Sequence, residues 1–340
     1  MTRTTAMMAW AIALAFVCAP IQGAAQTAPA AAPRKAPAKA YVPARTAWGD
    51  PDLTGVYTNK DENGIPVERP SQFEGKKLED VDASEFTEIV RERNEASVAR
   101  APGIGGAETG AGPVHWYEHY DAKNSRPWLI TDPADGRIPP VTREAEQRAA
   151  ARAAARAGRG PADSYEDRSL YDQCITRGLP GSMMPAIYGN SYQIHQAPGV
   201  VAIRYEMIHE TRLIPLDQRA HVGPRIQTYM GDARGHWDGA TLVVETTNFL
   251  PQAANRGASE KLRIVERFKP VGPDRVEWSV TFEDAATWAR PWTFAMNLTR
   301  DATQAPFEYA CHEGNYGLRN ILSAARAEEQ PASAPPKTGK

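Results

Sequence analysis

The stretch that decides the fold runs from Val200 to Leu216, VVAIRYEMIHETRLIPL, and continues after a short connection as Met230 to Phe249, MGDARGHWDGATLVVETTNF. From Ile203 to Leu213 the side chains alternate with period two, which predicts a β-strand. No Gly, Pro or Asn interrupts the run between Val200 and Ile214, so it is interpreted as one long strand. At about 3.3 Å per residue, a strand of this length has to coil, bulge or close into a barrel.

More strands are expected on both sides of this stretch. They are Asp52–Tyr57, Trp128–Ile130, Tyr192–Gln196, Ile226–Met230, Thr241–Thr247, Lys261–Pro270, Arg275–Phe282, Phe294–Thr299 and Phe307–Cys311. Asp232–Gly239 is interpreted as a turn region packed by Trp237. Because short strands follow one another without helices between them, they predict an antiparallel meander.

The predicted fold class is therefore mainly β. The meander is expected to close into a lipocalin-like barrel or to form a strongly curved sheet. Helical patterns at Val81–Ala99 and Pro140–Ala157 predict peripheral helices, and the pattern at Asn315–Ala327 predicts a C-terminal helix.

The two ends of the chain have compositions that predict no packed core. Residues 1–25 resemble a secretory signal peptide, with Arg3, an apolar core at Met7–Val17 and small residues at Gly23–Ala25 before the cleavage site. Residues 26–47 are rich in Ala and Pro and predict a flexible linker. Residues 48–327 are expected to form a single β-barrel-like domain with an N-terminal segment that wraps it. Residues 328–340 predict a disordered tail.

The charge balance limits the partners of the chain. The formal net charge is −2, and it becomes −3 once the leader with Arg3 is removed, which argues against nucleic acid as a partner. No other run is apolar over about 20 residues, so no membrane span is expected after cleavage. The expected location is the periplasm or the medium, and the expected partner is a small-molecule ligand or substrate.

Two cysteines remain after the leader is removed, Cys174 and Cys311. In the oxidising compartments that exported proteins reach, such a pair predicts a disulfide. The alternative is two unpaired, buried thiols.

Several blocks together resemble a widespread family of secreted, functionally uncharacterised bacterial proteins. The blocks are DLTGVY at 52–57, DPADGRIPP at 132–140, CITRGLPG at 174–181, 203–216, MGDARGHWDGATLVVETTNF at 230–249 and FEYACHEGN at 307–315. The resemblance covers nearly the whole mature chain and implies no activity. Some relatives have Arg where this chain has His236, which argues against His236 as a catalyst. The opening Gly55-Val56-Tyr57 also resembles the Gly-x-Trp of lipocalin-like (calycin) barrels.

A first group of candidate residues comes from the long strand. Arg204, Glu206, Glu210 and Arg212 would lie on one face. They form either a solvated surface with weak ion pairs or a charged barrel lumen that holds a ligand. The ligand-binding residues expected for such a lumen are Arg212, Tyr205, Glu245 and Glu266.

A second group lies at the predicted corner between the last strand and the C-terminal helix. His312 and Glu313 follow Cys311 and are capable of proton transfer. If the disulfide forms, Arg177 comes close to them. The alternative is a corner that only caps the helix and carries the disulfide.

A third group, His115 and His119, is spaced for one helical face, but no third ligand is evident and no metal site is predicted. No Gly-x-Ser-x-Gly, phosphate-binding Gly loop or dinucleotide fingerprint is present, so no organic cofactor is expected.

Three functions fit these features. The leading hypothesis is a cofactor-independent acid–base enzyme (a lyase, isomerase or hydrolase) that acts on a small, partly apolar molecule in a barrel pocket. Its expected catalytic residues are His312, Glu313, Glu206, Arg204 and Arg177. The alternatives are a non-catalytic barrel that binds a small molecule and a structural envelope protein. A His and a carboxylate that converge on one point favour the enzyme, whereas a cavity lined by apolar groups and Arg favours the binding protein.

Overall fold

The computed structural model describes residues 41–99, 126–186, 188–253, 255–303, 306–312 and 316–329. The predicted signal peptide, most of the linker, the two histidines at 115 and 119, Glu313 and all but the first two residues of the predicted C-terminal tail lie outside these residues. The strands are β1 (Gly55–Thr58), β2 (Ile130–Asp132), β3 (Ser191–Ala197), β4 (Val200–Tyr205), β5 (Thr211–Pro215), β6 (Asp232–Asp238), β7 (Thr241–Thr247), β8 (Arg263–Gly272), β9 (Arg275–Glu283) and β10 (Trp292–Arg300). The helices are α1 (Ala83–Ala99), α2 (Arg143–Ala155) and α3 (Gly317–Glu328).

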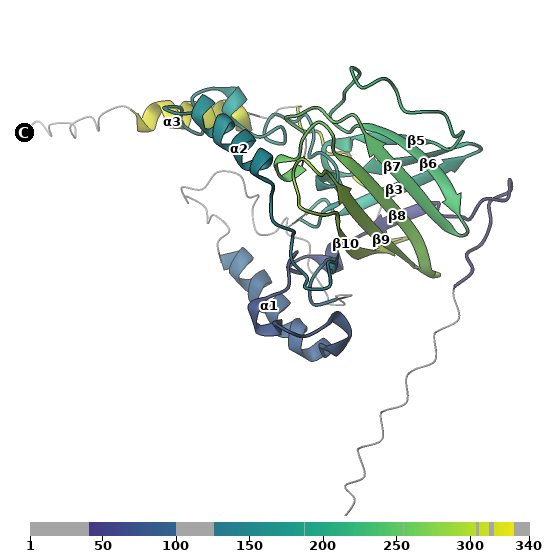
Figure 1. The fold of residues 1–340 in the computed structure, drawn as a ribbon. Helices are drawn as coiled ribbons and strands as arrows, with labels where there is room; N and C mark the ends of the chain where they lie inside the picture. Colours follow the sequence, from purple (N-terminus) through teal and green to yellow (C-terminus); the bar gives the residue numbers. More distant parts are fainter. Residues whose placement is uncertain are drawn as a thin grey trace, which may run out of the picture. The chain divides into compact units, whose positions relative to one another are not determined.

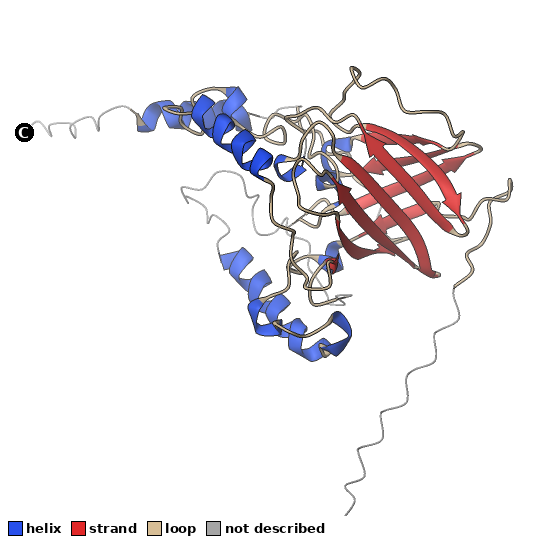
Figure 2. Cartoon of the chain, in the orientation of Figure 1, coloured by secondary structure: helices blue, strands red, loops and turns tan. Residues whose placement is uncertain are grey.

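The strands form one strongly curved sheet (Figures 1 and 2). Its order is β5-β4-β3-β1-β10-β9-β8-β7-β6, with every neighbouring pair antiparallel, and β2 adds to β10. The two end strands approach each other: a Cβ atom on Gly235 of β6 would lie 2.7 Å from side-chain atoms of both Ile214 and Leu216. The sheet is thus a nearly closed barrel of nine antiparallel strands, which confirms the predicted mainly β fold class and the C-terminal helix. Among the described residues, no helix is both long and apolar enough to cross a bilayer.

Aromatic side chains dominate the inside of the barrel. On β9 every second residue is buried, including Trp278 and Phe282. The ring of Phe294, on the neighbouring strand β10, lies 5.5 Å from the Trp278 ring and 6.1 Å from the Phe282 ring. Burying such a side chain contributes about 1.5–3 kcal/mol, so the alternating pattern decides which face of each strand turns inward.

The predicted long strand at 200–216 is wrong as a single strand. It is a hairpin in which β4 pairs antiparallel with β5, so that Arg204 faces Thr211 and Ile203 faces Arg212. The chain reverses through Ile208 and His209, whose φ angles are 61° and 46°. Left-handed backbone is disfavoured for residues other than Gly by about 1–2 kcal/mol, which is why the composition does not predict a turn here.

Contacts around this reversal offset its conformational cost. Ile208 and its neighbour Met207 are buried. Nδ1 of His209 lies 2.8 Å from the carbonyl oxygen of Tyr309, and the His209 N–H donates to the Glu206 carbonyl. Tertiary packing therefore fixes a turn that local sequence does not specify.

Three further segments differ from the prediction. Residues 232–238, expected as a turn, form strand β6, whereas 226–230 and 307–311, expected as strands, are irregular. The β6 pattern is hard to read because its interior side carries Gly235, which the close approach of β5 requires. The segment 307–311 is instead fixed by the disulfide at Cys311.

Strand β1 closes the sheet between β3 and β10. Arg300 of β10 lies over the Tyr57 ring at 5.1 Å and donates to the Tyr57 hydroxyl (2.9 Å) and to the Thr54 carbonyl (2.8 Å). A Cβ atom on Gly55 would lie 2.7 Å from the Arg300 guanidinium. The absence of a side chain at Gly55 thus leaves space for the Arg300 guanidinium, which packs on the Tyr57 ring.

Candidate functional site

A buried ion pair crosses the inside of the barrel. Nη1 of Arg212 on β5 donates to Oε2 of Glu266 on β8 at 2.5 Å, and Nη2 donates to Oε1 at 3.2 Å. The indole N–H of Trp278 donates to the same carboxylate at 3.1 Å. Side-chain exposure is 3% for Arg212 and 0% for Glu266. Burial lowers the pKa of the Arg212 guanidinium, but the Glu266 carboxylate outweighs it, so this pKa lies above its ordinary value.

Of the four residues predicted to bind a ligand, three lie at this buried pair. Tyr205 is fully buried near Arg212 and Glu266, and burial raises the pKa of its phenol. Its hydroxyl and Nε of Arg212 form no hydrogen bond within the described part of the chain. Glu245 lies instead on the outer face, paired with Arg263. The interior cluster is therefore enclosed by protein. Its role is to stabilise the barrel, because a ligand has no access to it.

The residues predicted to act in catalysis occupy several environments. Glu206 is buried at the end of the β3–β4 ladder, where its carboxylate accepts from the Ser191 N–H at 3.2 Å. Arg204 is half-buried on the outer side of β4, because the hairpin places it on the face opposite Arg212. His312 is exposed. Of the four of these residues that are described, Arg177 alone lines the pocket described below.

The disulfide between Cys174 and Cys311 is present, with Cα atoms 5.7 Å apart, which confirms its prediction. It joins the segment before β3 to the segment after β10 and so holds together the two ends of the chain from β3 to β10. Residues 169–184, which surround Cys174, form one wall of a pocket.

The pocket has a volume of 390 Å³ and lies between this segment and the loop at 252–253. Its walls come close at Gly178, where a Cβ atom would lie 3.4 Å from the Ala253 carbonyl oxygen. The lining residues are Ser169, Leu170, Tyr171, Thr176, Arg177, Gly178, Gly181, Met184, Gln252 and Ala253. The lining thus combines apolar side chains, hydroxyl groups and one arginine.

The guanidinium of Arg177 is the only cationic group among the described lining residues. It is half-buried and lies 5.5 Å from the centre of the Tyr171 ring, in a cation–π contact. No described carboxylate lies within ion-pair distance of it. A guanidinium held on an aromatic ring keeps its N–H donors in a fixed plane, which suits a carboxylate ligand.

Three tyrosines brace the pocket wall. The hydroxyl of Tyr171 interacts with Tyr309 and Tyr188, and it lies 3.5 Å from Sδ of Met207. Burial raises the pKa of both the Tyr171 and the Tyr188 phenol. These phenols therefore stay protonated at neutral pH and act as hydrogen-bond donors.

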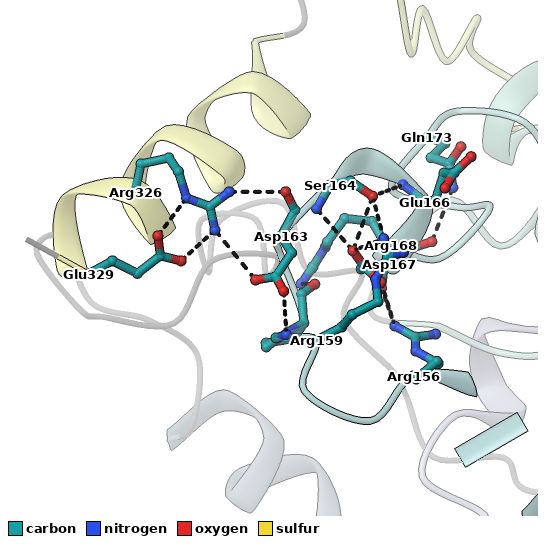
Figure 3. A network of polar contacts seen from close by, with 12 residues as sticks. Arg156, Arg159, Asp163, Ser164, Glu166, Asp167, Arg168, Gln173, Arg326 and Glu329 are labelled. Carbon is teal, nitrogen blue, oxygen red and sulfur yellow. Dashed lines mark hydrogen bonds and ion pairs between the residues drawn. The ribbon is translucent and has the colours of Figure 1, made fainter. Parts of the chain in front are cut away.

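Ion pairs hold the chain that leads into this wall (Figure 3). Arg159 donates to Asp167 at 2.8 Å, and this hydrogen bond, with help from Ser164, lowers the pKa of Asp167 to about 2. Arg326 of α3 donates to the Asp163 carbonyl at 3.0 Å. The C-terminal helix is thereby attached to the segment that precedes the pocket.

A carboxyl group borders the pocket from behind Thr176. The Thr176 hydroxyl donates to Glu210 at 2.8 Å and accepts from the Gly178 N–H at 2.9 Å. Burial raises the pKa of Glu210, and the bond from Thr176 and the charge of Arg212 offset only part of that rise. Sequence reasoning placed Glu210 on the strand face but gave no indication of Thr176 or Tyr171, whose contribution depends on the fold.

The raised pKa of Glu210 gives an expected pH dependence of stability. A carboxyl whose folded-state pKa exceeds its unfolded value of about 4.3 stabilises the fold below that pH and loses this contribution as the pH rises through the folded pKa. The free energy of unfolding of wild type relative to Glu210→Gln should therefore fall as the pH is raised from about 4 to about 7. Urea unfolding at both values measures it, and a difference that is constant with pH would contradict the expectation.

Comparisons with known proteins identify no family for the chain. No protein-family model matches it and no curated protein matches it. One similar solved structure is a secretary abundant heat soluble (SAHS) protein from Ramazzottius varieornatus, at 15% identity with a TM-score of 0.24, over 39% of this chain and 87% of that one. The barrel assignment rests on the strand pairing. Membership of the secreted bacterial family stays a prediction.

Proposed function

We propose that the chain binds a small anion with an apolar part in the pocket beside Arg177. The observation that carries this proposal is a half-buried guanidinium that lines a 390 Å³ pocket and pairs with no described carboxylate. Leu170 and Met184 supply apolar contact area for the rest of the ligand. A pocket of this kind, mostly apolar with a few polar groups that fix orientation, is typical of small-molecule sites.

Binding is favoured over acid–base chemistry at this pocket for a chemical reason. The described lining contains no histidine and no carboxylate. Glu210 reaches it only through the Thr176 hydroxyl. We place this function outside the cytoplasm, in the periplasm or the medium, since a disulfide such as Cys174–Cys311 forms in oxidising compartments.

Arg177→Gln is the variant that tests the proposal. A hydrogen bond to a charged group contributes about 1.5–3 kcal/mol, so the variant should bind at least about tenfold more weakly. The purified protein would be incubated with periplasmic extract, and the retained molecules identified by mass spectrometry. Calorimetric titration of the retained carboxylates, with benzoate as a simple reference, would then give the affinities.

Arg225→Gln is the matched control. Arg225 is exposed in the loop before β6, so this substitution changes the net charge equally without touching the pocket. If Arg177→Gln retains the same molecules as wild type and as the control, the pocket is not the binding site.

A further inference from the structure

A second pocket lies beside the loop that follows β5, at the other end of the β4–β5 hairpin from the reversal at Ile208. It has a volume of 480 Å³ and is formed by the loop after β5 together with residues of β6 and β7. The described lining residues are Gln218, Arg219, Ala220, His221, Arg234, Gly235, His236, Trp237 and Glu245. Its lining contains what that of the Arg177 pocket lacks, imidazoles and a carboxylate.

The loop that carries His221 is fixed onto β6 by several hydrogen bonds. Asp232 accepts from the Val222 N–H at 3.0 Å and from Arg234 at 2.6 Å. Arg234 in turn donates from Nε to the Ala220 carbonyl at 3.2 Å. The backbone on both sides of His221 is therefore held, and the imidazole sits on a rigid support.

The two ring nitrogens of His221 have different environments. Nδ1 lies 2.9 Å from Oδ2 of Asp232. Burial raises the pKa of Asp232, but hydrogen bonds from Val222, His221 and Arg234 outweigh it, and the pKa ends below its ordinary value. Since an ionised carboxylate only accepts hydrogen bonds, Nδ1 carries the proton, and in the neutral ring Nε2 has the free lone pair.

Nε2 lies 3.5 Å from Oε1 of Glu245, longer than a well-formed hydrogen bond. The hydrogen bond from Arg263 lowers the pKa of Glu245 despite its partial burial, so this carboxylate stays ionised near neutral pH. Arg263 also pairs with Glu283. Once Nε2 has taken up a proton it can interact favourably with this carboxylate, and His221 contributes to the lowered pKa of Glu245.

Trp237 forms an apolar part of the pocket wall. The indole nitrogen of Trp237 is buried and has no acceptor within the described part of the chain. Trp237 alternates with the exposed His236 on β6, and its side chain packs against the barrel core while also lining the pocket. The Trp237 ring also provides a flat apolar surface for a substrate.

We propose that this second pocket is a hydrolytic site in which His221 is the general base for small esters with an aromatic part. Nε2 of His221 takes a proton from a water molecule, the water oxygen bonds to the ester carbonyl carbon, and the alcohol or phenol leaves with the electron pair of the broken C–O bond. The imidazolium then returns the proton to the leaving group or to solvent. Asp232 is a positioning residue that sets the tautomer.

The probe for the test is 4-nitrophenyl acetate, whose product 4-nitrophenolate is measured by absorbance. General-base catalysis typically contributes about 10²–10⁴-fold; with this probe we expect His221→Gln to lower kcat/KM at least about tenfold. Asp232→Asn should lower kcat with little change in KM, and two-bond ¹H–¹⁵N correlation spectra should show His221 moving from the Nδ1–H to the Nε2–H tautomer.

Two histidine variants serve as controls. His195→Gln removes an exposed imidazole on β3 and should leave the rate unchanged. His236→Gln removes the other imidazole at the pocket and separates the two candidates. Circular dichroism would check folding of each variant. The proposal is overturned if wild type hydrolyses the probe no faster than His221→Gln, if His236→Gln alone abolishes the rate, or if wild-type His221 is in the Nε2–H tautomer.

Discussion

Glu266→Gln and Arg212→Met should each destabilise the barrel by about 3–5 kcal/mol, because each leaves one buried charge without its partner. In Glu266→Gln the Arg212 guanidinium, 3% exposed, keeps its charge inside the barrel. In Arg212→Met the carboxylate retains only the Trp278 N–H as a described donor. The pair also links β5, at one end of the sheet, to β8 near the other end, so both variants weaken barrel closure.

The double variant Arg212→Met/Glu266→Met separates the cost of an unpaired buried charge from the cost of altered packing. Replacing a buried ion pair by apolar groups of similar volume is often neutral or stabilising, so most of the loss should be recovered. Arg290→Met is the control, since its pair with Asp132 is exposed and such pairs contribute about 0–1 kcal/mol. Urea unfolding gives all four values. Single variants as stable as Arg290→Met would show that the interior is hydrated.

Replacing both Cys174 and Cys311 by Ala should cost about 2–5 kcal/mol of unfolding free energy. The cysteines are 137 positions apart, and a chain-entropy treatment assigns about 5 kcal/mol to a loop of that size as an upper figure. The loop contains β3 to β10, so the disulfide limits the unfolded state of almost the whole barrel. Tyr309, two residues before Cys311, would lose its fixed place at the pocket wall.

Reduction of the wild-type disulfide supplies an independent measurement. Urea unfolding with and without reductant should shift the wild-type midpoint to that of the double alanine variant. The variant itself should not respond to reductant. Identical midpoints for oxidised wild type and variant would mean that the disulfide contributes nothing to folding.

Local pattern was sufficient for the fold class and for several strands. Thr241–Thr247 was predicted with the bounds that β7 has, because Leu242 and Val244 turn inward between clear turn residues. The β4–β5 hairpin was missed because Ile208 and His209 adopt left-handed backbone that their side chains do not favour. Tertiary contacts overrode local preference there, and the missed reversal placed Arg212 on the face opposite Arg204.

The candidate sites were less predictable than the fold. Arg177 was singled out through its distance from Cys174, a relation that the disulfide preserves in space. His221 was not, because Asp232 and Glu245 reach it from two strands whose register the sequence does not reveal. Composition identifies groups that could react, whereas their convergence depends on pairing between segments far apart in the chain.

The position of β1 also constrains the order in which the chain can assemble. Tyr57 pairs with Arg300, 243 residues later, and with Tyr192 on the other side. During synthesis the first strand emerges long before either neighbour exists, and its pairing on the β10 side has to wait until the last strand has formed. Contacts between such distant segments slow folding because a large loop has to close first. The place of this short N-terminal strand between β3 and β10 is therefore expected to be completed late in folding.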